Sequence, residues 1–509
     1  EETPAAGPSR LLLFGLDAAG WDVLKPMCRQ GYLPNISRAM ENGIAADMKT
    51  LDPTVSVMLW TTIATGMLPE NHGISNWLSE GMDTSGQLAI TSDRRRVPAF
   101  WNLTGDRKIL VANWWASWPV EPVNGVMVSN RAHFPELDHT VYPPEFAAQI
   151  AQQPRISREA LEHELTVLNP DHRSIRLSEF FARQLQKDRF YLDVFENFLS
   201  RDRFDIAAVF IRGIDILEHE YLRDVREDAT AIPEVPVEQQ GIVKAYYRYV
   251  DRWLGRLTDL MGPDTGIVLV SDHGMDPVDK LPPLIEGLDL NKLLRVMERT
   301  GNGMFDFDGF NDNQKYPPGL RRGVSWIGNG TPPDGRVEKL AALLRSIRCD
   351  HYSLFRTVTV TDDPHERIHL ELDPSPTFKS VIRFQGEEIP VMSVTGMIIH
   401  PRSGQHWHAP DGIFLATGPG IRSPATAQSI RIQDIMPTLM HWMALPVADD
   451  LDGQPMSTIF TDEFLAGNPP VRIKTYGPRS GSSAPVEAPE AVEESIRSEL
   501  ESLGYIQID

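Results

Sequence analysis

Short apolar runs alternate with amphipathic stretches along most of the chain. Four runs have the length and continuous hydrophobicity of buried strands: residues 10–17 (RLLLFGLD), 106–112 (DRKILVA), 204–211 (FDIAAVFI) and 266–271 (GIVLVS). The stretches between them, such as residues 178–201 and 240–261, have the pattern of helices. Strands that alternate with helices predict an α/β fold, with a mostly parallel central sheet sandwiched by helices.

The pattern changes between residues 278 and 400, where Gly, Asn, Asp and Pro cluster in GNGMFDFDGFNDNQKYPPG before the alternating IHLELD and SVIRFQG. We interpret residues 278–400 as an inserted cap subdomain in a catalytic core made of residues 10–277 and 401–460. YGPRSGSSAPVEAP has the composition of a linker, and EAVEESIRSELESLG has the pattern of an amphipathic helix. Residues 461–509 are therefore expected to form a C-terminal linker and a short helix.

Composition excludes several classes of protein. The chain of 509 residues has 41% hydrophobic and 23% charged residues, which is an ordinary globular profile. Its 49 basic and 70 acidic residues give a net charge of −21, and this charge disfavours a nucleic-acid scaffold because it repels phosphate backbones. No apolar run approaches the roughly 18 residues of a membrane helix, so no transmembrane segment is expected.

Two further features concern metal chemistry and compartment. Cys28 and Cys349 are too few for a disulfide framework or a thiolate cluster, so a metal would have to use histidine and carboxylate ligands. The opening residues EETPAAGPSR lack a charged n-region and an apolar h-region. They leave the compartment open, and we favour an extracytoplasmic location, periplasmic or secreted with the signal removed, over the cytoplasm.

Three of the strand-like runs lead into an aspartate: Asp17, Asp215 and Asp272. In open parallel sheets ligands bind outside the carboxyl ends of the strands, so these carboxylates are expected to converge. His219 follows Asp215 at helical spacing, and His273 follows Asp272 directly. Carboxylate and imidazole together are ligands for zinc and related divalent ions. An aspartate after a strand often only caps a helix, but a cap does not require a histidine beside it.

The segment PTVSVMLWTTIATGMLPENHGI at residues 53–74 supplies a candidate nucleophile. Small hydroxylated residues precede an apolar helical run, so Ser56 is expected at or near a helix N-terminus. Free backbone N–H groups and the helix dipole favour an anion there. Metal coordination is one way to activate a serine hydroxyl. The alternative is that Thr54 or Ser56 only caps the helix.

Several tryptophans lie in or near this segment: Trp60, Trp77, Trp114, Trp115 and Trp118. Such residues usually anchor a core or a loop, and stacking on a substrate is the alternative.

Six motifs together resemble the alkaline phosphatase superfamily, and within it the type I phosphodiesterase/nucleotide pyrophosphatase family. They are GLDAAGWD at 15–22, PTVSVMLWTTIATGMLPENHGI at 53–74, IRGIDILEH at 211–219, VSDHGM at 270–275, HAPDGIFLATGPGI at 408–421 and DIMPTLMHWMALP at 434–446. They occur in the family's order and span most of residues 10–456. The inserted segment and the tail lie outside this resemblance.

The resemblance implies two divalent metal ions and a serine nucleophile that is transiently phosphorylated, Ser56. One ion would be held by Asp215, His219 and His408. The other would be held by Asp17, Asp272 and His273, with Ser56 reaching it. The HAPDGIF context favours His408 over His406. Zinc is the first expectation for both ions, with manganese or iron as alternatives.

Two departures from the family pattern concern the nucleophile and the phosphate-binding residue. The eukaryotic-type pyrophosphatases commonly have threonine where this chain has Ser56. They also have a phosphate-binding asparagine five residues after the HGI histidine, whereas Asn76 follows His72 by four residues. Asn76 is therefore a substrate-binding candidate at a shifted position. His72 is expected to order the turn after the helix.

We predict a metal-dependent phosphoryl-transfer hydrolase that cleaves small phosphodiesters or nucleotide pyrophosphates through a phosphoserine. A phosphomonoesterase of the same superfamily is the alternative enzyme, and a non-catalytic phosphate-ligand-binding protein with the same fold is the alternative of another class. Residues 51–80 contain no Lys or Arg, which favours the lower charge of a diester. A basic side chain could still come from elsewhere, and both Arg212, just ahead of Asp215, and the inserted cap are possible donors.

Overall fold

The computed structural model describes residues 7–51, 54–75, 90–226, 235–277, 406–423 and 429–479. Shorter described stretches are 284–288, 310–311, 323–328, 336–349, 352–360, 368–372, 381–384, 387–390, 395–399, 425–426, 489–490, 492–494 and 498. The chain divides into two compact units, one of residues 1–277 with 406–496 and the other of residues 278–405 with 497–509. That the inserted segment is a substrate cap stays a prediction.

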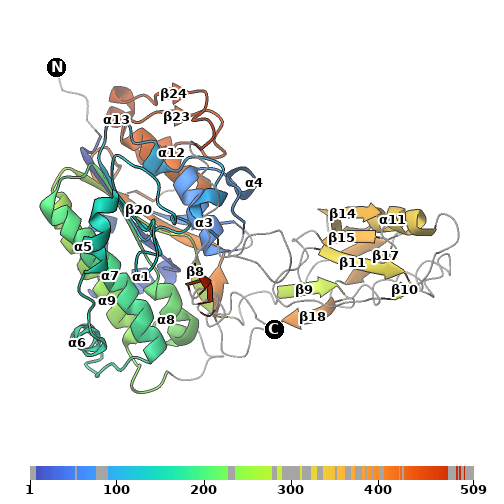
Figure 1. Ribbon diagram of the computed structural model, residues 1–509, viewed down its shortest axis with the longest axis horizontal. Coiled ribbons are helices and arrows are strands. Elements are labelled where there is room, and N and C mark those ends of the chain that lie inside the picture. Colours follow the sequence, from blue (N-terminus) through green and yellow to red (C-terminus); the bar gives the residue numbers. More distant parts are fainter. Residues whose placement is uncertain are drawn as a thin grey trace. The chain divides into compact units, whose positions relative to one another are not determined.

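A mixed sheet forms the centre of the first unit (Figure 1). Within the described residues its strands follow the order β21 (Ala425–Thr426), β2 (Gly43–Lys49), β20 (Asp411–Thr417), β7 (Thr265–Ser271), β1 (Arg10–Leu16), β6 (Ile206–Ile211), β3 (Ile109–Ala112), β4 (Gly125–Val128) and β5 (Val141–Tyr142), with β22 (Ile430–Arg431) beside β2. The inner strands β7, β1, β6, β3 and β4 are parallel, whereas β20 is antiparallel to both its neighbours. The predicted α/β class with a mostly parallel sheet is confirmed.

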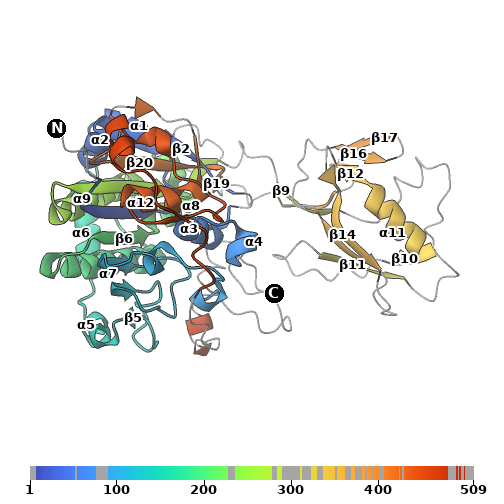
Figure 2. The same cartoon turned by 90° about the horizontal axis from the view of Figure 1, so that it is seen from above.

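Helices cover both faces of this sheet (Figures 1 and 2). The described helices of the first unit include α1 (Trp21–Arg29), α2 (Pro34–Glu41), α3 (Ser56–Thr65), α4 (Pro69–His72), α5 (Ala147–Ala151), α6 (Arg158–Leu168), α7 (Glu179–Arg201), α8 (Gly213–Tyr221), α9 (Ile242–Met261), α12 (Ile435–Trp442) and α13 (Asp462–Gly467). Helices α7 and α9 contact the central strands on one face. On the other face Trp60 of α3 and Met440 of α12 share a buried core with Leu11 and Leu13 of β1. Each described helix is too short or too polar to span a lipid bilayer.

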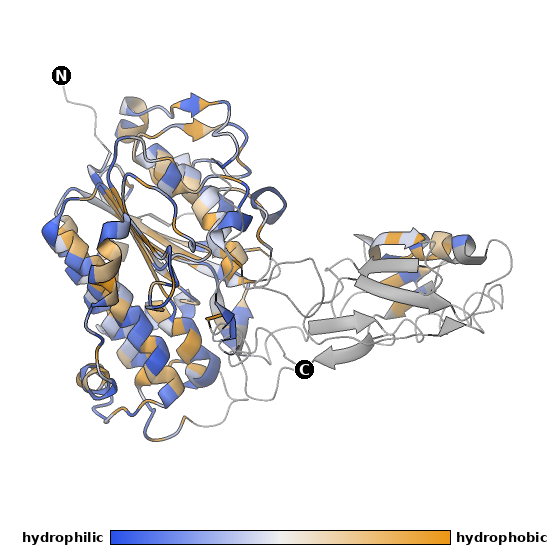
Figure 3. Ribbon diagram, viewed as in Figure 1, coloured by the Kyte–Doolittle hydropathy of each residue, from blue (hydrophilic) through white to orange (hydrophobic). Residues whose placement is uncertain are grey.

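After Arg10, strand β1 is apolar and buried, as expected of a strand that is covered on both faces. Leu11 and Leu13 face α3 and α12, and alternation sends the buried Leu12 and Phe14 to the opposite face. Figure 3 shows apolar residues concentrated in the central strands, while the helices carry both apolar and polar residues. Gly15 is required where α3 crosses the strand, since a Cβ there would lie 2.7 Å from the Trp60 ring. This close contact holds α3 against the sheet.

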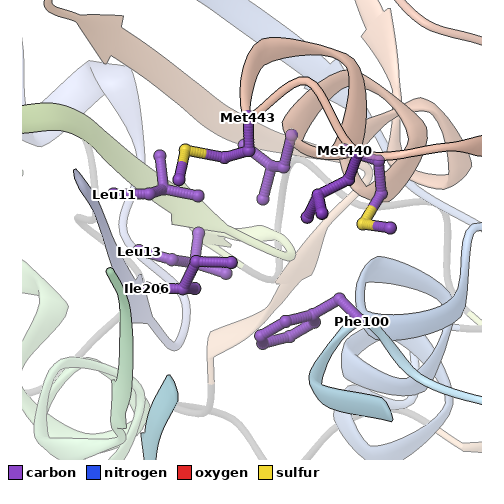
Figure 4. A pocket seen from close by; sticks show the side chains of 8 residues that line it. Leu11, Leu13, Phe100, Ile206, Met440 and Met443 are labelled. Atoms are coloured by element: carbon purple, nitrogen blue, oxygen red, sulfur yellow. The ribbon is translucent and has the colours of Figure 1, made fainter. Parts of the chain in front are cut away.

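An apolar gap in the packing lies between the start of β1 and α12 (Figure 4). Its lining residues are Leu11, Leu13, Phe100, Ile206, Leu439, Met440, Met443 and Leu445. Leu11 and Ile206 are at the amino ends of their strands, so this gap is at the end of the sheet opposite the strand-end aspartates. It has no polar group with which to bind a phosphate ester.

The remaining described elements are small. In the first unit β8 (Gly274–Pro277) pairs with β19 (His406–Ala409), and β23 (Val447–Ala448) pairs with β24 (Arg472–Ile473). The second unit contains helix α11 (Arg336–Ser346) and strands β9 (Leu284–Leu288), β10 (Phe310–Asn311), β11 (Gly323–Gly328), β12 (Arg348–Cys349), β13 (Tyr352–Ser353), β14 (Phe355–Val360), β15 (Ile368–Leu372), β16 (Val381–Phe384), β17 (Glu387–Pro390) and β18 (Thr395–Ile399). The predicted alternating segments correspond to β15 and β16.

Candidate active site

The carboxyl ends of β1, β6 and β7 lie level with one another at one edge of the sheet. Leu16 of β1 is in register with Ile211 of β6 and with Ser271 of β7. Asp17 and Asp272 therefore leave the sheet side by side. Asp215 is in the first turn of α8, which begins directly after β6. The convergence expected for the three aspartates is what the register produces.

One group of side chains surrounds the imidazole of His273. Its Nε2 atom lies 3.4 Å from Asp17 Oδ1 and 3.6 Å from Asp272 Oδ2. Ser56 Oγ is 3.3 Å from the same nitrogen. All four residues are fully buried. Asp17, Asp272 and His273 thus present ligand atoms close enough to hold one cation, with the Ser56 hydroxyl beside them.

A second group surrounds the carboxylate of Asp215. Asp215 Oδ1 lies 3.2 Å from His219 Nε2 and 3.3 Å from His408 Nε2. The two histidine Nε2 atoms are 3.3 Å apart. The His273 ring stacks on the His408 ring at 3.7 Å, so the two groups adjoin. Asp215, His408 and His273 also offer atoms close enough for one cation, and His273 stands between the two groups.

Backbone carbonyls determine which nitrogen His273 and His408 present to the centre. His408 Nδ1 donates to the Thr54 carbonyl at 2.9 Å, and His273 Nδ1 donates to the Gly274 carbonyl at 3.0 Å. A carbonyl can only accept, so each Nδ1 carries a proton. Nε2 is therefore the atom that both rings present to the centre, and a histidine oriented in this way by its other nitrogen is typical of metal sites.

The electrostatics of the site favour a bound cation. No hydrogen bond within the described residues reaches either carboxylate oxygen of Asp17 or of Asp272. Burial, reinforced by the negative charge of Asp17, raises the pKa of Asp272 well above its usual range. Burial opposes a charge on His273, but Asp272 and Asp17 outweigh it and raise its pKa to about 10. These raised pKa values keep protons on Asp272 and His273. A bound divalent ion would compensate the negative charge of the buried carboxylates in place of those protons.

In the Asp215 group the pKa of the carboxylate is shifted in the opposite direction, downward. Burial disfavours its carboxylate, but His219 and His408 hold the pKa of Asp215 well below its usual range. Burial, with His273 nearby, lowers the pKa of His408 to about 4, which leaves this ring neutral near pH 7. An ionised carboxylate and a neutral imidazole are the forms that bind a metal. The residues of both groups therefore fit divalent ions.

Helix α3 begins at Ser56, and the site lies at this N-terminus. The first backbone N–H groups of a helix have no partner within it, and they favour a phosphoryl oxygen placed before them. Ser56 has no exposed surface, so its hydroxyl faces the histidine and carboxylate groups rather than solvent. The sequence argument for a helix start at this serine agrees with the structure.

His72 is the last residue of α4, the short helix that follows α3, close to the position expected for it. Its Nδ1 accepts the Ile74 N–H at 3.2 Å, so its Nε2 donates to Thr62 Oγ1 at 3.1 Å. Burial, with the charges of Arg95 and Arg96, lowers the pKa of His72 to about 3. This neutral ring ties the turn to the helix. Asn76 lies outside the described residues.

Most of the tryptophans named from the sequence lie in the core, as expected there, instead of stacking on a substrate. Trp60, Trp114 and Trp118 are buried. Trp115 is half-buried, and the Arg212 guanidinium lies 4.6 Å from the centre of its ring. Trp77 lies outside the described residues. Among the described tryptophans of this set, Trp115 therefore stands beside the candidate site.

Asp188 of α7 supports the site although none of the sequence motifs includes it. Its carboxylate accepts the N–H groups of Arg212 (3.1 Å) and Gly213 (2.7 Å), together with the Tyr246 hydroxyl. The sequence contains one sign of its role, because Asp188 is a charged residue on the apolar face of α7. It lies three residues after the buried Leu185 and four residues before the buried Leu192. Asp188 fixes the start of α8, which carries Asp215 and His219.

The sequence model of the type I phosphodiesterase / nucleotide pyrophosphatase family matches residues 11–370. The chain belongs to this family. The resemblance drawn from the motifs is thereby confirmed, and the family identifies the chain as a phosphoryl hydrolase of the phosphodiesterase and pyrophosphatase type. The match includes residues 278–370, which the motifs leave outside the resemblance, and it ends before His408.

Solved structures that match this chain include phosphonoacetate hydrolase from Sinorhizobium meliloti in complex with phosphonoformate. It is 15% identical, with a TM-score of 0.45 over 84% of this chain and 94% of that one. Murine ectonucleotide pyrophosphatase/phosphodiesterase 5, in an inactive form with AMP, is 14% identical, with a TM-score of 0.46 over 89% of this chain and 100% of that one. The human form of that protein is 15% identical, with a TM-score of 0.42 over 87% and 97% of the two chains.

Proposed function

We propose that this family member is a metal-dependent hydrolase of small phosphodiesters or nucleotide pyrophosphates, with Ser56 as its nucleophile. One observation carries the proposal. Two groups of buried carboxylates and histidines converge on the carboxyl edge of the sheet, and the hydroxyl of Ser56 lies 3.3 Å from the histidine that joins them. A helix N-terminus that favours an anion lies at the same point.

Two ions would be held by these groups, one by Asp215, His219 and His408 and the other by Asp17, Asp272 and His273. Zinc is the first choice for this donor set, with manganese or iron as alternatives. Such ions supply Lewis-acid chemistry, which lowers the pKa of a hydroxyl and compensates the charge of a phosphoryl group.

Ser56 would act in two steps. In the first step a bond forms from Ser56 Oγ to phosphorus as the bond to the leaving oxygen breaks, and the leaving oxygen departs protonated as an alcohol. In the second step a water oxygen bonds to phosphorus, the phosphorus–Oγ bond breaks, and Ser56 regains its proton. The sum is a diester and water giving a monoester and an alcohol. The N-terminus of α3 would orient the phosphoryl oxygens during both steps.

A phosphomonoesterase is the second candidate, and one observation favours it. Arg212 lies with its Nε atom 3.8 Å from Asp17 Oδ2, so a cation stands beside the site although the nucleophile segment has none. A dianionic monoester gains more from such a cation than a monoanionic diester does.

The nucleophile is tested by comparing Ser56→Ala with Thr54→Ala on bis(4-nitrophenyl) phosphate. Ser56→Ala is expected to lower kcat at least about 1,000-fold, because no other hydroxyl replaces the attacking oxygen. It should keep two divalent ions per chain by elemental analysis, since six other side chains would hold them. Thr54→Ala retains the backbone carbonyl that His408 uses, so it should keep the larger part of the activity.

Three results would contradict the proposal. They are an active Ser56→Ala variant, full activity in protein with one ion or none, and binding of phosphate esters without turnover. The last result would identify a non-catalytic binding protein. Chelator-treated protein reloaded with zinc, manganese or iron in turn decides which metal supports turnover.

A further inference from the structure

Glu218 is a buried carboxylate between two candidate ligands on α8. It follows Asp215 by three residues, directly precedes His219 and is 1% exposed. Its Oε1 atom accepts the hydroxyl of Tyr247 on α9 at 2.9 Å, and Tyr247 has no exposed surface. Within the described residues no hydrogen bond reaches Glu218 Oε2. The bond from Tyr247 therefore fixes how this carboxylate lies, one residue from a candidate ligand.

The same tyrosine also reaches the loop that follows β1. The backbone N–H of Gly20 donates to the Tyr247 hydroxyl oxygen. Gly20 is three residues after Asp17, and α1 begins at the next residue. One hydroxyl thus joins α8, which carries two ligands of the Asp215 group, to the loop that begins with Asp17 of the first group.

The loop after β1 has a conformation that needs such support. Ala18 in this loop is fully buried and has a φ of 65°, in the left-handed region that residues with a Cβ rarely adopt. A conformation of this kind persists only where the surroundings hold it. Ala18 shares a small buried cluster with Leu222, which directly follows α8, and with Met275 of β8. Tyr247 holds the same loop two residues further on, at Gly20.

Stability alone does not explain a polar pair at this place. Replacing both partners of a buried hydrogen bond by apolar groups of the same shape is often neutral or even stabilising. What a hydrogen bond adds is direction, because it holds its two atoms at one distance and angle. Direction matters beside the Asp215 group, whose facing ligand atoms are only 3.2 to 3.3 Å apart.

From these contacts we infer that Glu218 and Tyr247 are positioning residues for the metal centre. Their hydrogen bond keeps the two ligands on α8 at a fixed place relative to Asp17. This rests on the proposed function, and within it on the metal ions. Ligands have to be held within about 0.5 Å of their working geometry, so a small shift of α8 is enough to weaken metal binding. The pair acts on the metal through the ligands without contacting it.

The test measures zinc affinity by chelator competition and the absorption spectrum of the cobalt(II) form, which reports the geometry of the bound ions. Tyr247→Phe removes only the hydroxyl, and it is expected to weaken zinc binding about tenfold and to shift the cobalt bands. Glu218→Leu removes the acceptor and should have the same effect. Glu218→Gln should stay within about threefold of the wild-type affinity, because its amide oxygen can accept the same hydrogen bond.

Tyr249→Phe is the matched control on the same helix. Tyr249 is almost as deeply buried as Tyr247, and its ring packs against Tyr246 and Trp253. Loss of its hydroxyl leaves the bond to Glu218 in place. This variant should therefore keep the wild-type zinc affinity and cobalt spectrum. Thermal unfolding of each variant in its metal-free form measures the contribution of each hydroxyl to stability separately.

Two results would overturn the inference. One is a Tyr247→Phe variant with the zinc affinity and cobalt spectrum of wild type, whatever its stability, since the pair would then serve only to pack α8 on α9. The other is an equal loss of affinity in Glu218→Gln and Glu218→Leu, since the hydrogen bond would then not be what holds the ligands. A wild-type protein that binds two zinc ions but hydrolyses no phosphate ester would contradict the proposed function and leave this inference standing.

Discussion

The orientation of single side chains gives the candidate site its chemistry. Two histidines each give one N–H to a backbone carbonyl and keep Nε2 for the centre. His72 instead uses one nitrogen on Ile74 of its own turn and the other on Thr62 of α3, so it has none to offer a ligand. The same residue type is thus a candidate ligand in one place and a structural link in another, and the difference lies in which partners its two nitrogens have.

His408 and His406 form a matched pair for testing one of these assignments. His408→Ala is expected to empty one of two metal positions, because it removes an Nε2 atom that lies 3.3 Å from both Asp215 and His219. Activity should fall at least about 100-fold with it. His406→Ala, two residues earlier on the same strand, should keep both ions. Elemental analysis of the two variants checks this expectation, and equal metal contents would contradict it.

At the scale of elements, close packing and buried hydrogen bonds fix the position of the start of α8. A Cβ on Gly213 would lie 2.3 Å from the Tyr246 hydroxyl of α9, so only glycine allows the two helices to pack this closely. Asp188 receives the first N–H groups at this helix start and is wholly buried. Burial raises the pKa of Asp188 to about 6, although the hydrogen bonds from Tyr246, Arg212 and Gly213 oppose this shift.

Asp188→Asn is expected to weaken metal binding about 10- to 100-fold although Asp188 does not belong to either ligand group. An amide has one acceptor oxygen, and its NH2 group would face the N–H donors of the α8 start. Chelator competition measures the loss.

Asp193→Asn is the control for this variant on the same helix, because Asp193 pairs with Arg189 and supports no ligand. Equal metal affinities of the two variants would show that the carboxylate of Asp188 does not position α8.

At the scale of the whole first unit, a buried cluster of charges joins Arg479 near the C-terminal end of this unit to residues 95–121. Glu121 pairs with Arg95, accepts the Trp101 indole N–H at 2.8 Å and accepts Arg479 Nε at 2.7 Å. Further along, Val492 packs against Trp118 and Leu137. Residues more than 300 positions apart thus share one small buried region, and the segment after residue 461 contributes to the core.

Glu121→Gln is expected to destabilise this unit in a pH-dependent way. Burial alone would raise the pKa of Glu121, but Arg95 and Arg479 outweigh it and lower the pKa to about 2. A carboxyl pKa below its usual value stabilises the fold above about pH 4.5, and this stabilisation is lost as the pH falls towards 2. At pH 7 the variant should lose about 3 kcal/mol, since it leaves buried arginines without a counter-charge.

Urea unfolding at pH 7 and pH 3 checks this expectation, because the difference from wild type should be smaller at pH 3. Asp462→Asn breaks the exposed pair with Arg422 and should change the midpoint little at either pH. A constant difference for Glu121→Gln across this range would mean that the charge of Glu121 is not what stabilises the cluster.

Features that depend only on residues close together along the chain can be predicted from the amino-acid sequence. The apolar runs before Asp17 and Asp272 are strands, and the two long helical stretches correspond to α7 and α9 within two residues at each end. Asp215 and His219 share a helix face because they are four residues apart. Asp272 and His273 leave one strand together. In each case the pattern and the contact both lie within one or two turns of chain.

Other features depend on partners far along the chain. The hydrophobic pattern does not single out β20, and it contains nothing that makes this strand antiparallel to β7. His408 reaches the site because β19 pairs with β8 across the inserted segment, and Arg212 stands beside Asp17 because β6 and β1 share a register. Periodicity reports whether a residue faces the core but not which distant residue it faces. Register and packing decide that, since they depend on many long-range contacts formed together.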